Sequence, residues 1–264
     1  MPEPRPDTFW AGRGVELEDL TRLREAQAWR PEGLPLRREA YVALAAQSSD
    51  LRSLQPCVRE ELTQIGLLQE DGTPTDDGRT VVTVLGSGGR RLRLEAAAGG
   101  VPTSLEATLH AGVAVVWATD SPVPWAGRES LGRDALRVAT HGHLQWLPVM
   151  HLPAELCAWL GVGPAWQPVP DPPVTVDREL LGVRTDEPAT PLPDSASDDL
   201  RVLWAEPWFT WLLAVDTGHV AAGLHAGRHG QHRIVEDPHD ASLVCLLPWN
   251  SEHLFRTLTT ASLA

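Results

Sequence analysis

Hydrophobic residues in the first quarter of the chain recur at helical spacing. Between residues 15 and 29, apolar positions every three or four residues stand among charges, which predicts an amphipathic helix. The same pattern predicts helices over 37–47 and 55–66. Pro56 suits the first turn of the latter helix, and Gly66 suits its C-cap. Residues 1–14, polar and proline-rich, are expected to form a disordered leader.

After these helices the pattern changes to the alternation of apolar and polar positions that is typical of strands. Strands are expected over residues 90–95, 105–109, 113–117, 136–138, 144–149, 200–204, 209–215, 220–224, 233–235 and 243–247. Short helices are expected over 153–160 and 249–258, the second capped by Asn250 or Ser251. Turn residues at 70–72 and 76–78 are expected to separate elements.

One pattern occurs twice, about 100 residues apart. The strands at 144–148 and 244–248 both end in proline and lead into a short helix. Each half reads as antiparallel strands followed by a helix, which suits a pseudo-twofold α+β design. A single domain over 15–264 would then hold two halves, about 15–163 and 200–264. The proline- and aspartate-rich stretch 164–199 would connect them.

Composition excludes several kinds of chemistry. The chain has 264 residues and no lysine, so the P-loop lysine, Schiff-base lysine and kinase lysine are all impossible. The net charge of −13 argues against nucleic acid as a ligand. The sequence has no apolar run of membrane-spanning length and no signal peptide, and its three dispersed cysteines suit a reducing compartment. We therefore expect a cytoplasmic protein with no membrane or nucleic-acid partner.

Five histidines lie between residues 219 and 240, and His225 and His229 have a spacing that could bind zinc on a helix. Three glycines between residues 223 and 230 disfavour that helix. The segment is therefore interpreted as a flexible hairpin loop of solvated histidines, with no metal or other cofactor expected.

Nucleophile motifs are also missing. Ser87 stands in a glycine-rich stretch, residues 85–89, that lacks the nucleophile-elbow pattern and reads as a helix-to-strand loop. The three cysteines stand in apolar surroundings, as structural thiols do: Cys57, Cys157 and Cys245. No catalytic residue is assigned, and we expect a protein that is not an enzyme.

The eleven tryptophans, against one tyrosine and three phenylalanines, are the unusual feature of the composition. Most are expected in the core. Trp125 stands in a loop, 120–132, that offers no strand or helix to bury it. Three others are similarly placed, at the leader, a loop and the start of the closing helix: Trp10, Trp166 and Trp249. Tryptophan in such positions is enriched at protein interfaces, so at least one is expected to be an exposed anchor for a partner.

The order of these features resembles the EspG proteins of actinobacterial ESX (type VII) secretion systems. The matching segments are Gly33-Leu-Pro-Leu36, Glu61-Leu-Thr-Gln-Ile-Gly-Leu67, Glu70-Asp-Gly72, Ala111-Gly-Val-Ala-Val-Val116 and Leu147-Pro148. A proline-rich middle and C-terminal strands with a terminal helix follow in the same order.

This resemblance implies a central antiparallel sheet flanked by helical bundles with quasi-twofold symmetry. It also implies a cytoplasmic chaperone that shields the tip of a helical-hairpin substrate, a PE–PPE-like dimer, before secretion. By position, the family's contact regions correspond to the loop 120–134 and the closing helix. The implied contact residues are Trp125, Arg128, Glu129, Arg133, Trp249, Glu252, His253 and Arg256.

Two alternatives stay open. The order around residues 62–82 resembles the helix, wing and strand of a winged-helix DNA-binding regulator, with Arg90, Arg91 and Arg93 as a small basic patch. The histidine cluster could instead belong to a metal-dependent enzyme.

Overall fold

The computed structural model describes residues 29–46, 50–128, 134–162, 172–216 and 218–263. In these residues, ten strands form one antiparallel sheet in the order β1-β5-β4-β3-β2-β7-β8-β9-β10-β6. The strands are β1 (Leu34–Arg37), β2 (Arg90–Ala98), β3 (Val101–His110), β4 (Val113–Ala118), β5 (His141–Pro148), β6 (Val174–Asp177), β7 (Trp208–Val215), β8 (Gly218–Ala226), β9 (Gln231–Glu236) and β10 (Leu243–Pro248).

The described α-helices connect and cover these strands. They are α2 (Arg38–Ala46), α3 (Pro56–Gln64), α4 (Asp76–Gly86), α5 (Asp134–Thr140), α6 (Leu152–Trp159), α7 (Arg178–Asp186), α8 (Asp198–Trp204) and α9 (Ser251–Leu263). Short 3-10 turns lie at η1 (Leu51–Ser53), η2 (Val123–Trp125), η3 (Val149–His151) and η4 (Gly227–His229). No described helix has the length and apolar character needed to cross a membrane.

The sheet order is symmetric about the contact between β2 and β7. In each half an edge strand, β1 or β6, leads directly into a helix, α2 or α7. Each half also ends with a strand followed by a helix, β5 with α6 and β10 with α9. Both α2 and α7 begin with the same dipeptide, Arg38-Glu39 and Arg178-Glu179. The predicted α+β fold, a central antiparallel sheet flanked by helices with quasi-twofold symmetry, is confirmed.

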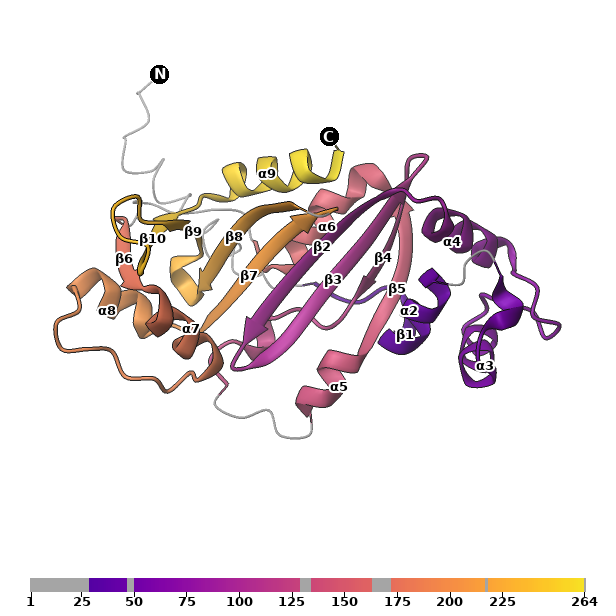
Figure 1. Cartoon of the computed structure of the whole chain (residues 1–264), viewed down its shortest axis with the longest axis horizontal. Coiled ribbons are helices and arrows are strands. Elements are labelled where there is room, and N and C mark those ends of the chain that lie inside the picture. The colour runs from indigo at the N-terminus through magenta and orange to yellow at the C-terminus, as the bar shows by residue number, and fades with distance from the viewer. Residues whose placement is uncertain (1–28, 47–49, 129–133, 163–171, 217, 264) are drawn as a thin grey trace, which may run out of the picture.

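The two faces of the sheet are covered differently. One face packs under α6 and α9 in a cluster that includes Leu94, Trp159 and Leu258. The opposite face is covered at one end by α2, α3 and α4, and at the other end by α7 and α8, in two separate clusters. Figure 1 looks onto this second face: β2 and β3 lie in front, α7 and α8 to the left, and α2 to α4 to the right.

Most predicted elements are present, including the hairpin of β3 and β4 and the helix α9. Asn250 caps α9, because its Oδ1 accepts the backbone N–H of His253 at 2.8 Å. The predicted helix-to-strand loop is confirmed for residues 87–89, which join α4 to β2, whereas residues 85 and 86 still belong to α4; Ser87 Oγ donates to the carbonyl of Val84.

Three local predictions are wrong. Residues 76–78 are the first turn of α4, not a turn between elements; Thr75 caps this helix by accepting the N–H of Gly78. Aspartate and threonine favour turns and helix N-termini alike, so the residue types did not discriminate. Residues 136–138 and 200–204 are helical, within α5 and α8, because short apolar runs fit either period.

The predicted connection 164–199 needs a further correction. Its described part contains the strand β6 and the helix α7, which are the second-half counterparts of β1 and α2. The second half therefore begins with β6 rather than near residue 200. The predicted leader 1–14 and nearly all of the predicted helix 15–29 lie outside the described residues.

Candidate partner-binding groove

Four central strands, β3, β2, β7 and β8, lie between the two helical ends on the second face of the sheet. Side chains alternate along β2, so Leu92 and Leu94 enter the core under α6 and α9. Arg93, Glu95 and Ala97 point to the opposite side, where they form part of the floor of a groove. We call this feature the central groove.

Helices from both halves wall the central groove. Arg38 at the start of α2 and Ala139 of α5 lie on one side, and Leu181 and Gly182 of α7 lie on the other. The groove has a volume of about 660 Å³. That is within the usual range of ligand sites, roughly 300–1,000 Å³, although here the groove is open along a sheet face.

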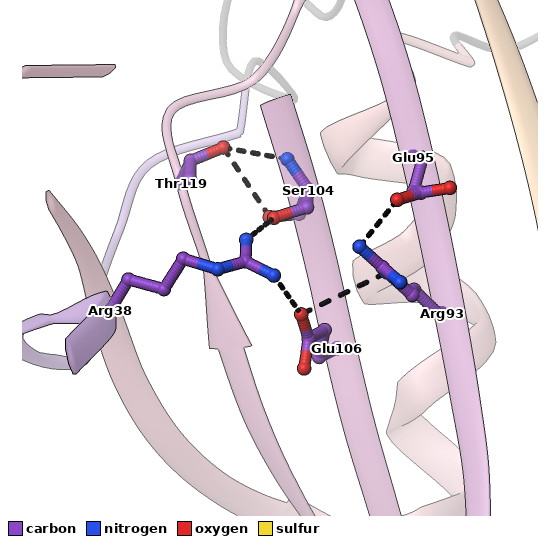
Figure 2. Close-up of polar contacts among 6 residues, drawn as sticks. All are labelled: Arg38, Arg93, Glu95, Ser104, Glu106 and Thr119. Carbon is purple, nitrogen blue, oxygen red and sulfur yellow. Dashed lines mark hydrogen bonds and ion pairs between the residues drawn. The ribbon is translucent and has the colours of Figure 1, made fainter. Parts of the chain in front are cut away.

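A polar network occupies the α2 side of the floor (Figure 2). Arg38 reaches from α2 to β3, where its Nη1 donates to Ser104 Oγ at 3.0 Å and its Nη2 to Glu106 Oε1 at 2.8 Å. Arg93 Nη2 lies 2.5 Å from Glu95 Oε1, and its Nε lies 3.9 Å from the same Glu106 oxygen. Because these side chains are only partly buried, each pair contributes about 0–1 kcal/mol. The network fixes positions more than it stabilises the fold.

Two further contacts hold this network in place. The N–H of Ser104 donates to Thr119 Oγ1 at 2.9 Å, and the Arg38 guanidinium lies 5.4 Å from the centre of the Trp117 ring. Arg38 is therefore held by β3 and by the aromatic core under α2. The charged side of the floor is pre-arranged rather than free to rotate.

The β7 and β8 side of the floor is apolar. Leu212 pairs in register with Glu95 of β2 on one side and with Ala222 of β8 on the other. Ile234 and Leu181 extend this apolar surface toward α7. Val220, at the bulge where the pairing of β7 and β8 shifts register, is 43% exposed. A charged part of the floor on β2 therefore lies beside a largely apolar part on β7 and β8, and Arg178, Thr185 and Asp186 of α7 add polar groups at the far wall.

The groove contains no arrangement suited to catalysis among the residues that the structure describes. Its described lining includes neither histidine nor cysteine. Ser104 Oγ accepts a hydrogen bond from Arg38 and has no base beside it in that lining. The carboxylates of Glu95 and Glu106 are both paired with guanidinium groups.

The predicted loop anchor is buried. Trp125 is 7% exposed and belongs to the cluster under α6 and α9, so the expectation that nothing buries it is wrong. The turn η2 folds its indole inward, and the Arg128 guanidinium covers the ring at 4.9 Å. Glu129 and Arg133 lie outside the described residues. Contact of this loop with a partner stays a prediction.

The second predicted anchor, Trp249, is buried as well. It is 7% exposed, and its ring stacks on Trp211 with 5.6 Å between ring centres. Glu252, His253 and Arg256 are exposed on α9, where Glu252 and Arg256 form an ion pair at 2.7 Å. Their role in partner binding stays a prediction. The structure places them on α9, and no groove-lining residue comes from that helix.

The histidine segment is not a loop of solvated side chains. His225 lies in β8 and His232 in β9, and both are buried. The imidazole of His225 stacks on Phe209 at 4.8 Å, and its Nδ1 lies 3.3 Å from Gln231 Nε2. Within the described ranges, no three His, Cys, Asp or Glu side chains gather as a metal site would require.

The cysteines differ from one another. Cys157 is buried on α6, and burial raises the pKa of its thiol to about 12. Cys57 is exposed on α3, so the apolar surroundings expected for it are wrong. The winged-helix alternative requires a wing at 73–78 and a strand at 80–82, but residues 76–82 belong to the helix α4.

Comparisons with known proteins find likeness in structure but none in sequence. No family model and no curated protein matches the chain. A solved structure of the Mycobacterium tuberculosis type VII secretion system chaperone EspG5, in complex with a PE25–PPE41 dimer, overlaps with a TM-score of 0.45. The sequence identity is 12%, and the overlap covers 86% of this chain and 94% of that one.

Proposed function

We propose that the protein binds other proteins and holds a polypeptide segment of its partner in the central groove. The observation that carries this proposal is the open face of four central strands, walled by α2 and α5 on one side and α7 on the other. Leu212, Ala222 and Ile234 present apolar surface there beside fixed charged groups. Protein interfaces combine these two kinds of surface, with the apolar part providing most of the affinity.

In its finer form, the proposal is that the protein is a cytoplasmic chaperone of an ESX (type VII) secretion system. Its partner would be a secreted helical-hairpin protein, a dimer of the PE–PPE kind that is bound in the EspG5 structure. The sequence segments quoted above support this form. The quasi-twofold antiparallel sheet is also the fold that those segments imply.

Gly182 offers a test of the coarse proposal. It lies on α7 in the groove wall, and a Cβ at this position would meet nothing within 4 Å. We expect Gly182→Trp to fill part of the groove without loss of stability, because tryptophan is about 0.5 kcal/mol more favourable than glycine inside a helix. Val183→Trp is the matched control, on the same helix at a 41% exposed position outside the groove lining.

In the experiment, the protein is co-expressed with helical-hairpin substrates encoded beside its gene. For each complex that forms, the two partners are then purified separately and their affinity is measured by calorimetric titration. We expect a stable complex whose affinity falls at least about tenfold, roughly 1.4 kcal/mol, in Gly182→Trp but not in Val183→Trp. Equal affinity for both variants would exclude the groove and direct attention to Glu252, His253 and Arg256. Absence of any complex with such substrates would refute the finer form.

A further inference from the structure

The described sheet ends in two equivalent edge strands, β1 and β6. Each leads directly into a helix that begins with arginine and glutamate. Pro35 of β1 therefore corresponds to Thr175 of β6, and Arg37 corresponds to Asp177. An edge strand leaves every second residue with its N–H and C=O groups turned away from the sheet, where another strand can pair with them.

β1 is closed to a further strand. The bond from Val149 N–H to Gly112 C=O shows which residues of β5 bond to β4, and the remaining ones bond to β1. By this alternation the outward residues of β1 are Pro35 and Arg37. Pro35 has no N–H to donate. The N–H of Arg37 already donates to Glu61 Oε1 at 2.9 Å.

β6 is not closed in this way. The N–H of Arg178 donates to the C=O of Ser242, beside β10, at 2.8 Å, so the even-numbered residues of β6 bond to β10. Thr175 and Asp177 therefore direct their N–H groups away from the sheet. Both residues are exposed, and within the described ranges no further strand lies beyond β6 and no side chain accepts these two N–H groups.

The open groups of β6 are complementary to themselves. They are the C=O of Pro173, the N–H and C=O of Thr175, and the N–H of Asp177. The C=O of Asp177 is not among them, because this residue is the N-cap of α7 and its carbonyl accepts the first bond of the helix. In an antiparallel pairing centred on Thr175, Asp177 lies opposite Pro173 of the second copy. The unavailable acceptor then meets the residue that has no donor, and every other edge group is bonded.

The side chains suit the same register. The sequence around Thr175 is symmetric, with a valine on each side, so Val174 lies opposite Val176 of the second copy and Thr175 lies opposite its own equivalent. Pairs of β-branched residues favour antiparallel pairing, whereas like charges directly opposite each other oppose it. Asp177 lies opposite a proline, so the pairing brings no two carboxylates face to face.

We infer that β6 pairs edge to edge with β6 of a second copy of this chain, in antiparallel register centred on Thr175. The two-fold axis of such a pairing is perpendicular to the sheet, so the two sheets become continuous and both central grooves open on the same side. The strand contact involves about five residues a side, against roughly 20–30 in a typical stable interface, so the dimer forms at high micromolar concentration. The inference does not depend on the proposed function.

The test is sedimentation equilibrium of the full chain from about 10 µM to about 1 mM, in about 0.3 M salt to screen the net charge of −13. We expect the apparent mass to rise from 28.8 kDa toward twice that value. Thr175→Pro gives β6 the residue that β1 carries at the equivalent position, so it should fold and should weaken association at least about tenfold. Thr175→Val keeps the N–H and is the matched control, which should associate as the wild type does.

Amide hydrogen exchange, followed by NMR on the wild type, tests the same bonds without a substitution. The N–H groups of Thr175 and Asp177 should exchange at least about threefold more slowly at about 1 mM than at about 10 µM. The N–H of Val176 already bonds to β10 and should change little. Equal exchange of Thr175 at both concentrations would contradict the pairing even if Thr175→Pro did not fold.

Three other outcomes would overturn the inference. The first is a mass that stays at 28.8 kDa over the whole concentration range. The second is association that Thr175→Pro leaves unchanged, which would place the interface elsewhere. The third is a monomeric chain whose binding to a co-expressed partner is lost in Thr175→Pro, which would assign the edge to an extended segment of that partner. None of these results depends on Gly182→Trp, so the proposed function is tested separately.

Discussion

Gln231 joins four parts of the core, so its replacement should destabilise the fold strongly. The side chain is 5% exposed at the start of β9. Its Oε1 accepts the indole N–H of Trp211 at 2.9 Å, and its Nε2 donates to the carbonyl of Leu160, just beyond α6, at 3.0 Å. Nε2 also lies 3.3 Å from His225 Nδ1.

The perturbation is Gln231→Leu, which keeps most of the volume and removes both polar atoms. The Trp211 N–H and the Leu160 carbonyl would each lose the partner that Gln231 now supplies. An unsatisfied buried group costs about 1–3 kcal/mol, so the two together predict a loss of roughly 2–6 kcal/mol in the free energy of unfolding. The backbone bond from Trp249 N–H to the Gln231 carbonyl, 2.8 Å long, does not depend on the side chain and should survive.

The assay is urea unfolding followed by circular dichroism and tryptophan fluorescence, compared at constant m-value. Gln69→Leu, at an exposed turn, is the matched control and should stay within about 0.5 kcal/mol of the wild type. A loss below about 1 kcal/mol for Gln231→Leu would show that the surrounding groups find other partners. The reasoning from unsatisfied groups would then be refuted.

Three further predictions concern capping, thiols and alkaline pH. Thr75→Ala removes the cap of α4 and should cost about 1 kcal/mol in urea unfolding; Thr75→Ser, which keeps the hydroxyl, should cost less. Maleimide should label Cys57 within minutes in the native protein and Cys157 only after unfolding; equal rates would contradict the burial of Cys157. Burial raises the pKa of Cys157 to about 12 and, with help from the Glu106 carboxylate, also raises that of Tyr41. The folded state therefore holds these protons more tightly, and the stability they provide should be complete below about pH 8.5 and should fall as pH rises above that. Two results would contradict this pH dependence: urea midpoints of the wild type that stay constant from pH 8 to 11, or midpoints of Tyr41→Phe and Cys157→Ala that fall as much as those of the wild type.

The sequence predicts those parts of the fold whose signals are local. Asn250 before an apolar-periodic run marks α9, and alternation marks the hairpin of β3 and β4. The burial of Trp125 and Trp249 has no such local signal. Both tryptophans stand beside regular elements, and they become buried only because the core under α6 and α9 lies beside them.

The central groove was missed for a related reason. The alternation of Arg91, Arg93 and Glu95 with leucines indicates a strand with one polar side. It does not indicate whether that side faces a helix or open space. This depends on where α2 and α7 pack, which is set by long-range contacts of the edge strands β1 and β6.

The quasi-twofold design explains why the groove lies at the centre of the sheet. Each half packs its helical cluster toward its own end of the sheet, and among the described residues the groove lies between the two clusters, with α7 contacting the junction strands β2 and β7 at one side. The opposite face has no such gap, since α6 and α9 contact each other and pack on one continuous core. The junction can therefore be open on one side while the sheet beneath it stays rigid. On the groove face β2 carries Arg93 and Glu95, whereas β7 carries Thr210 and Leu212, so the two equivalent strands of a quasi-twofold scaffold present different side chains to the groove.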